Sequence, residues 1–166
     1  MSVLADTPTA RASAAAGSVL DPEVPVLTIA DLGVLRDVTI DADGLVTVTV
    51  TPTYSGCPAM DVIRRDVEDA VRAAGFSKVE VRTVLSPAWT TDWMTEQGRQ
   101  ALSDYGIAPP QRRSSTTGPI LVSLSVRCPQ CGSADTRELS RFGSTACKSL
   151  WACNACLEPF DHFKAF

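Results

Sequence analysis

Six cysteines are the residues of this sequence best suited to chemistry, and four of them share one spacing. Cys128 and Cys131 form one C-x-x-C pair, and Cys153 and Cys156 form a second pair 21 residues further along. A C-x-x-C turn presents two thiolates to one metal ion, and two such turns complete the tetrahedral shell of a structural zinc. The pattern therefore predicts a zinc site. Iron is the competing metal, because four thiolates also bind iron or iron–sulfur centres.

Cys147 lies between the two pairs, in the segment Phe142–Lys148. A zinc shell completed by four cysteines has no room for it. Two interpretations stay open at this point. The thiol is a small buried side chain, as free cysteines often are, or it is a spare ligand or exchangeable thiolate near Lys148.

The remaining cysteine, Cys57, lies in a segment that joins a predicted strand to a predicted helix. Pro58 suits the first helical position, so Cys57 is predicted to be the N-cap. There the helix dipole and free N–H groups would stabilise a thiolate and lower the pKa of the thiol. The residues alone leave a reactive or metal-binding thiolate and a structural N-cap equally open. Upstream, Asp21 and Glu23 are by themselves only capping and turn acids.

A small sheet and a helix are the elements that must position Cys57. Strands are predicted at 34–40 and 45–51, where the second alternates apolar and hydroxyl side chains with a period of two. Apolar side chains recur at three- and four-residue intervals between Met60 and Ala74, which predicts a helix. A third strand is predicted at 78–84. This order predicts an α+β fold: a small β-β-α-β sheet domain with helices packed on it, followed by a zinc-ribbon-like C-terminal domain.

The predicted organisation has four parts: a flexible leader at 1–18, an α+β domain at 19–107, a linker at 108–119 and a four-cysteine domain at 120–166. The segment after the third strand is predicted to become helical from about Asp92, and residues 120–126 are predicted to be a strand. Trp89 and Trp93 are interpreted as core side chains of the first domain, with an interface for a partner as the alternative.

Composition excludes several classes of function. The chain has 166 residues and a net charge of −4, so no global basic field draws it to nucleic acid. Its apolar runs fall short of the roughly 18 residues of a membrane helix. The C-x-x-C spacing favours metal over disulfides and hence the cytoplasm. The single histidine, His162, has no evident nucleophile beside it in the sequence, which argues against catalysis by this chain.

Taken together, several segments resemble a known family. The acidic start at Asp21–Val26, the Asp31–Gly33 turn and the Ser55–Pro58 loop resemble cytosolic iron–sulfur assembly factors. With the further segments Ser86–Trp93, Tyr105–Pro110 and Phe142–Lys148, the chain resembles the D subunits of bacterial phenylacetyl-CoA epoxidase complexes over residues 19–166.

The resemblance implies an accessory role in aerobic phenylacetate degradation, not catalysis of the ring epoxidation itself. A separate oxygenase subunit, served by a reductase subunit, performs that reaction in the family, and the D subunits help to mature a metal or iron–sulfur centre in a partner. Cys57 corresponds to the cysteine that holds or passes a transient iron–sulfur cluster, and Asp21 and Glu23 to the acidic segment beside it. Two alternatives remain: an electron-transfer subunit with iron at the four cysteines, and a zinc-ribbon adaptor without chemistry of its own.

Overall fold

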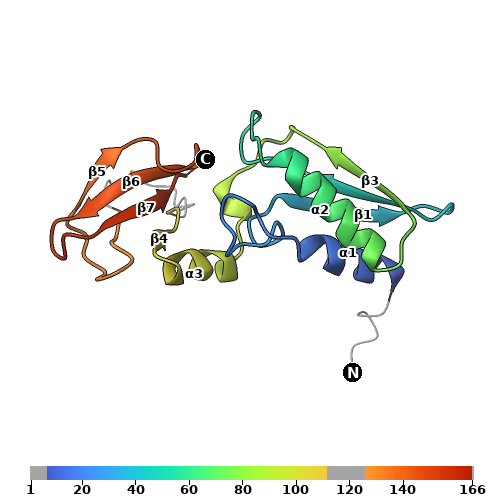
Figure 1. Ribbon diagram of the computed structural model, residues 1–166, viewed down its shortest axis with the longest axis horizontal. Helices are drawn as coiled ribbons and strands as arrows, with labels where there is room; N and C mark the ends of the chain where they lie inside the picture. The colour runs from blue at the N-terminus through green and yellow to red at the C-terminus, as the bar shows by residue number, and fades with distance from the viewer. Residues whose placement is uncertain (1–6, 112–125, 166) are drawn as a thin grey trace, which may run out of the picture. The chain divides into compact units, whose positions relative to one another are not determined.

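The computed structural model describes residues 7–111 and 126–165, which divide into two compact units, one ending at Thr95 and one beginning at Glu96. The first unit contains helices α1 (Pro8–Gly17) and α2 (Met60–Ala73), strands β1 (Leu35–Ile40), β2 (Leu45–Val50) and β3 (Lys78–Thr83), and a short 3-10 helix, η2 (Thr91–Trp93). The second contains helix α3 (Glu96–Asp104) and strands β4 (Ile107–Ala108), β5 (Thr136–Ser140), β6 (Lys148–Cys153) and β7 (Pro159–Phe163). Figure 1 follows this order along the chain.

A three-stranded sheet carries the first unit, in the order β1-β2-β3. β1 and β2 form an antiparallel hairpin, and β3 returns parallel to β2 after α2. The turn between β1 and β2 needs a left-handed residue, which Gly44 supplies with φ of 76°, while Asp41 accepts hydrogen bonds from the N–H groups of Asp43 and Leu45. The predicted α+β class and β-β-α-β order are confirmed.

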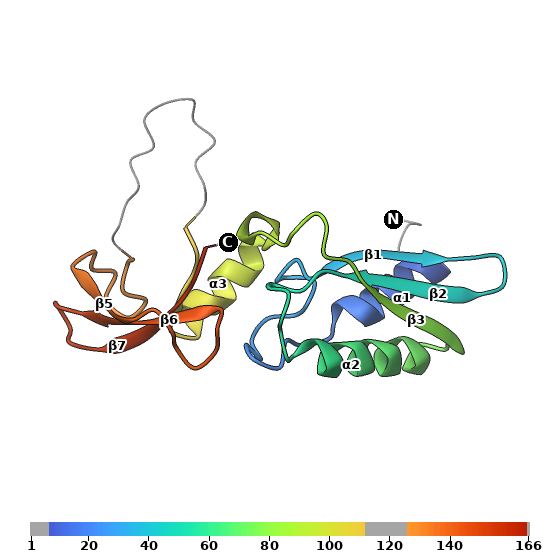
Figure 2. The same ribbon diagram turned by 90° about the horizontal axis from the view of Figure 1, so that it is seen from above.

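The core of this unit lies between the sheet and two helices, which Figure 2 shows on the same side of the sheet. Alternate valines of β2 face the helices, and the apolar stripe of α2 packs against them; all six side chains are at most 1% exposed: Val46, Val48, Val50, Ile63, Val67 and Val71. Burying each such side chain contributes roughly 1.5–3 kcal/mol. Apolar burial is therefore the main contribution that holds this unit together.

Residues 8–17 differ from the predicted flexible leader, because they form α1. Thr7 caps the helix by accepting a hydrogen bond from the N–H of Ala10, and Pro8 occupies the first turn. Ala12 and Ala16 are fully buried. Alanine has the highest helix propensity of all residues, so a run of alanines becomes a helix once the sheet domain offers it a surface.

Trp89 confirms the core interpretation. Its side chain is 5% exposed, and its indole N–H donates to the carbonyl oxygen of Leu32 at 3.0 Å. Trp93 is half-buried, with the guanidinium carbon of Arg36 3.6 Å from the centroid of its ring. Neither indole ring is fully exposed, as an anchor for a partner protein would be in the alternative interpretation.

The second unit is built on a four-stranded sheet in the order β4-β7-β6-β5. Residues 96–107 belong to this unit, whereas the predicted boundary placed them in the first domain. The predicted linker begins at Ala108, the last residue of β4, and its residues 112–119 lie outside the described residues. The predicted strand at 120–126 also lies outside them except for Val126, which is buried. Over the described residues, every helix is too short or too polar to cross a membrane.

Candidate functional site

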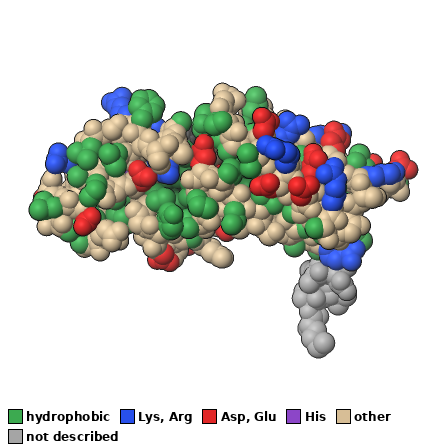
Figure 3. Space-filling view, in the orientation of Figure 1, with side chains coloured by type: hydrophobic (Ala, Val, Ile, Leu, Met, Phe, Trp, Pro, Cys, Tyr) green, Lys and Arg blue, Asp and Glu red, His purple; other side chains and the backbone are tan. Residues whose placement is uncertain are grey.

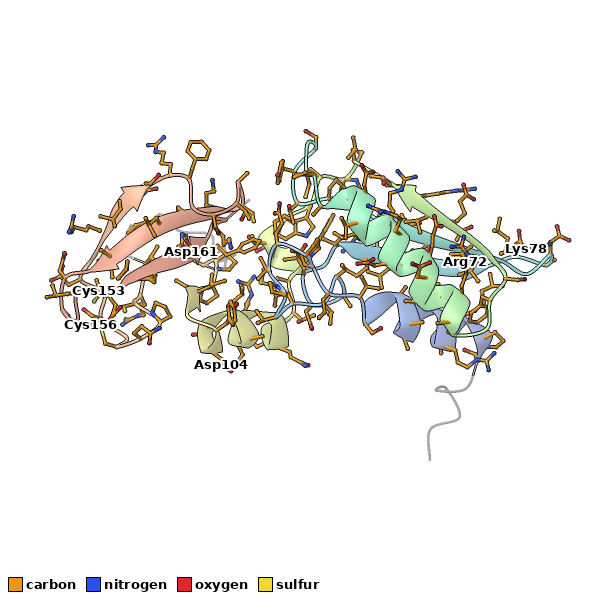
Figure 4. All side chains as sticks on the ribbon, viewed as in Figure 1. Arg72, Lys78, Asp104, Cys153, Cys156 and Asp161 are labelled. Atoms are coloured by element: carbon orange, nitrogen blue, oxygen red, sulfur yellow. The ribbon has the colours of Figure 1, made fainter. Side chains whose placement is uncertain are left out.

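The four predicted metal ligands come together at one end of the second unit's sheet. The sulfur atoms of Cys128, Cys131, Cys153 and Cys156 all lie within 4.8 Å of one another. Two pairs are closer: Cys128 and Cys156 at 3.7 Å, and Cys131 and Cys153 at 3.5 Å. A tetrahedral ion with bonds of about 2.3 Å separates its sulfur ligands by about 3.8 Å. The four sulfurs therefore fit a tetrahedral metal, and Figure 4 labels Cys153 and Cys156 at this end of the sheet.

The two C-x-x-C turns repeat one backbone design. The N–H of Cys128 donates to the carbonyl of Ser133 at 2.9 Å, and the N–H of Cys153 donates to that of Glu158 at 3.0 Å. The residue after the second cysteine of each turn is left-handed: Gly132 with φ of 74° and Leu157 with φ of 66°. Glycine takes this conformation without strain, whereas leucine does not. The turn geometry is kept at Leu157 despite that cost.

Electrostatics make the cluster receptive to a cation. The backbone N–H of Cys156 lowers the pKa of the Cys153 thiol to about 7, helped by the N–H of Ala155. The N–H of Glu158 also lowers the pKa of Cys156, but desolvation and the neighbouring thiols outweigh it and raise that pKa to about 12. Four sulfurs at these distances cannot all be thiolates unless a cation neutralises them. Four sulfur donors suit zinc, and they also suit iron.

Little apolar material surrounds the cluster. Cys128 and Cys153 are buried in a small group with Ala108, Val126 and Phe160. Polar contacts add support between the two turns, since the side-chain amide of Asn154 donates to a carboxylate oxygen of Asp135 at 2.8 Å. A group of this size contributes only a small part of the stability that a folded unit needs.

Cys147 is not part of the cluster. Its side chain is 3% exposed, and its sulfur lies 3.0 Å from the hydroxyl oxygen of Thr145. The neighbouring Lys148 is also buried and pairs with Asp161 at 3.7 Å. Of the two interpretations, burial as a small side chain is the one that the geometry favours.

Cys57 lies in the loop between β2 and α2, but it is not the N-cap. The helix begins at Met60 with Ala59 as its N-cap, so Cys57 is two residues upstream. Its N–H donates to the carbonyl of Tyr54 at 3.2 Å, and its own carbonyl accepts from the N–H of Met60 at 3.3 Å. The prediction of an N-cap fails because Pro58 and Ala59 form a turn before the helix starts.

The predicted lowering of the Cys57 pKa is also wrong. Burial of the half-exposed thiol raises its pKa, and the charges of Glu23 and Asp21 raise it further. The N–H of Ala59 and the side chain of Tyr54 act in the opposite direction but do not prevail. The helix dipole was expected to dominate, but the loss of solvent around the thiol, together with the neighbouring carboxylates, outweighs it.

The acidic segment predicted to accompany Cys57 does lie beside it, because both carboxylates act on its thiol. Asp21 is held in place: one carboxylate oxygen accepts from the N–H groups of Glu23 and Val24, both at 2.8 Å. Its side chain is 6% exposed. The site is therefore one thiol with two carboxylates near it, of which that of Asp21 is fixed.

Tyr54 is a member of this site that sequence reasoning missed. It hydrogen-bonds the thiol and lines a cavity of about 230 Å³ together with Ser55, Leu85 and Trp89. Its position three residues before Cys57, in the same loop, was the available signal. Leu85 and Trp89 come from the segment after β3, which no local pattern connects to the cysteine.

Comparison with known proteins gives one match for each unit. Residues 10–83 match the family described as iron–sulfur cluster assembly protein, and residues 112–164 match the PaaD zinc beta ribbon domain. The chain is 50% identical over 144 residues to an Escherichia coli (strain K12) protein that is named as the D subunit of a "Putative 1,2-phenylacetyl-CoA epoxidase". The match covers 87% of this chain and 85% of that protein.

Two further relatives match the first unit. An "Fe-S protein maturation auxiliary factor" of Porphyromonas gingivalis is 42% identical over 81 residues, covering 48% of this chain and 76% of that protein. A crystal structure of a domain of unknown function, DUF59, from Bacillus anthracis superposes with a TM-score of 0.53 at 30% identity. It covers 57% of this chain and 91% of that domain.

Proposed function

The chain belongs to the family of phenylacetyl-CoA epoxidase D subunits, and from this premise we propose that it helps to mature a metal or iron–sulfur centre in a partner subunit of that epoxidase system. The partners proposed are the oxygenase and reductase subunits. The chain acts in the cytoplasm as an accessory subunit and does not itself catalyse the epoxidation.

The observation that carries the proposal is the placement of Cys57 beside Asp21 and Glu23, in the unit that matches iron–sulfur cluster assembly proteins. A single thiolate is too few ligands to retain a cluster permanently, since clusters are held by four cysteines. The incomplete site suits a cluster or iron cargo that arrives, is held and leaves.

Burial favours the protonated thiol of Cys57 before the cargo arrives, and the carboxylates reinforce this effect. Their charges oppose ionisation of Cys57, but the same charges attract a cation, whose arrival neutralises them. A bound iron then stabilises the thiolate directly. Tyr54 donates a hydrogen bond that favours the thiolate form. The loop thus combines one soft ligand with a negative surrounding.

The four cysteines of the second unit are proposed to hold a structural zinc. Four protein ligands close the coordination shell, which is typical of a structural site and unlike a catalytic one that keeps a position open. The chemistry of the zinc here is to neutralise the thiolates and to fix the two turns. The zinc site is therefore proposed to have an architectural role.

The test is Cys57→Ser, with Cys147→Ser as a matched control for loss of a thiol outside the four-cysteine cluster. Partner subunits co-expressed with the Cys57 variant should contain less iron than those co-expressed with the control, and phenylacetate should no longer support growth. Partners already loaded with metal should epoxidise phenylacetyl-CoA without this chain. Full growth with Cys57→Ser would reduce the thiol to a structural role, and a need for the chain in every turnover would refute maturation.

A further inference from the structure

An open groove lies on the second unit's sheet, away from the four cysteines. Ser149 and Trp151 are two residues apart on β6 and so point to the same face of the sheet. His162 of β7 pairs with Ser149 in the register and shares that face. These three residues, with Arg141, Phe142 and Lys164, line a cavity of about 370 Å³ that is open on one side.

The same face is covered at its other end. Cys153 and Phe160 continue the face along β6 and β7, and there they are buried against Val126 and Cys128. The face therefore changes from a packed core near the cluster to a groove at the partly buried Trp151 and His162, with Ser149 buried at its floor. Hydrophobic side chains gather over this unit in Figure 3, whereas charges of both signs mix over α2.

Most polar groups on the floor of the groove form hydrogen bonds with one another. The indole N–H of Trp151 donates to the hydroxyl of Ser149 at 3.0 Å, and that hydroxyl lies 3.3 Å from Nδ1 of His162. The two rings meet edge to face at 5.9 Å. Among the described residues of the floor, only Nε2 of His162 lacks a partner, and it is buried. The floor offers aromatic surface more than hydrogen bonds.

The rim is cationic and carries an exposed aromatic ring. Phe142 is 72% exposed, with the ammonium of Lys164 4.9 Å from its ring centroid. That ammonium also donates to the carbonyl of Arg141 at 3.0 Å, and Arg141 itself lines the groove. Glu138 is the single carboxylate side chain among the described residues that line the groove. The groove is thus positive on a chain whose net charge is −4.

We propose that this groove docks an acidic segment of a partner protein, with an apolar side chain in the floor and flanking carboxylates on Arg141 and Lys164. Exposed aromatic and arginine side chains are enriched at protein interfaces. A small molecule is a poorer occupant, because ligand pockets enclose most of their ligand and this groove is open along one side. The proposal does not depend on the function of Cys57.

Capped tripeptides test the proposal on the full, zinc-loaded chain. The indole ¹H–¹⁵N resonance of Trp151 is the reporter, assigned by its loss in Trp151→Phe. N-acetyl-Glu-Phe-Glu-amide should shift this resonance saturably, whereas the Lys-Phe-Lys and Glu-Ala-Glu peptides should shift it much less. Arg141→Glu should weaken binding about tenfold, because reversing one rim charge turns attraction into repulsion. Arg65→Glu, an equal charge change on the exposed face of α2, should leave binding unchanged.

Three results would overturn the docking proposal. The first is an unchanged Trp151 resonance at the solubility limit of the acidic peptide. The second is equal binding of the acidic and basic peptides, or equal loss in the Arg141 and Arg65 variants. The third is a shift by phenylacetate at concentrations well below those the peptide requires, which would make the groove a small-molecule site.

Discussion

The two units of this protein solve the problem of holding a fold in different ways. In the first, the valines of β2 and the stripe of α2 form a continuous apolar core between a sheet and two helices. In the second, the buried group near the cysteines is small and includes two of the four clustered thiols. Four thiolates this close together repel one another unless a cation neutralises their charges. The first unit depends on its apolar core, and the proposed structural zinc would hold the second.

The comparison extends to the thiols themselves. Cys57 is a single thiol among carboxylates, with a raised pKa, whereas the four clustered thiols complete a tetrahedron by themselves. An incomplete set of ligands favours temporary binding, and a complete set favours permanent binding. The proposed function thereby places temporary and permanent metal chemistry in separate parts of one chain.

The largest effect expected is from breaking the tetrahedron. Cys128→Ser should release the metal and unfold residues 126–165 while sparing residues 8–95, because each unit has its own core. Amide hydrogen exchange resolved along the chain would measure this. Protection lost in both units at once would show that their stabilities are coupled.

A core truncation should give the opposite pattern. Ile63 is 1% exposed on α2, so Ile63→Ala should lower the free energy of unfolding of the first unit by about 2–5 kcal/mol. The zinc content should stay unchanged. The exposed neighbour Val62, at 36%, provides the control, and Val62→Ala should cost well under half as much. Loss of zinc in the Ile63 variant would contradict the separation of the units.

Acid should weaken the second unit through His162. Burial lowers the pKa of this imidazole to about 4 from its ordinary value of 6.5, so the fold favours the neutral ring. The resulting stabilisation is complete above pH 6.5 and is lost as pH falls from 6.5 toward 4. Between pH 7 and 5 the chain should lose about 1–2 kcal/mol more than His162→Gln does. Chemical unfolding of both proteins at pH 7 and pH 5 measures this difference in the free energy of unfolding. Equal losses in the wild type and in His162→Gln would exclude a buried neutral histidine. Acid release of zinc affects both proteins alike.

The smallest effect concerns the two matched turns. Leu157 is left-handed and 79% exposed, so Leu157→Gly should relieve strain with little loss of packing and stabilise the second unit by up to about 1 kcal/mol. Gly132→Leu, at the equivalent position, should destabilise it by about 1–2 kcal/mol. Thermal melts of the zinc-loaded proteins compare the pair. Changes of the same sign would show that the turns are not equivalent.

The fold of the first unit was largely predictable because its signals are local. The alternation in β2 and the helical stripe of α2 each determine an element within a few residues, and both appear in the structure. Helix α1 was missed because its alanine-rich sequence has no strong apolar stripe. Its burial depends on contacts with β1 and α2, which lie far along the chain.

The clustered cysteines were predictable for the same reason, since C-x-x-C spacing is a local property. The surroundings of Cys57 were not. Its pKa depends on Asp21 and Glu23, more than 30 residues upstream, and the cavity that its neighbour Tyr54 lines depends on Leu85 and Trp89 downstream. The predicted N-cap used only the nearest proline. The direction of the Cys57 pKa shift is decided by burial and by charges from distant segments, and the sequence pattern of one segment gives no information on either.

The division between a permanent and a temporary metal site is tested most directly by metal analysis of anaerobically purified protein, with its visible spectrum, before and after reconstitution with iron and sulfide. We expect about one zinc per chain in both the wild type and Cys57→Ser, with iron–sulfur absorption only in the reconstituted wild type. Stoichiometric iron in place of zinc, retained in Cys57→Ser, would place iron at the four cysteines and contradict the division.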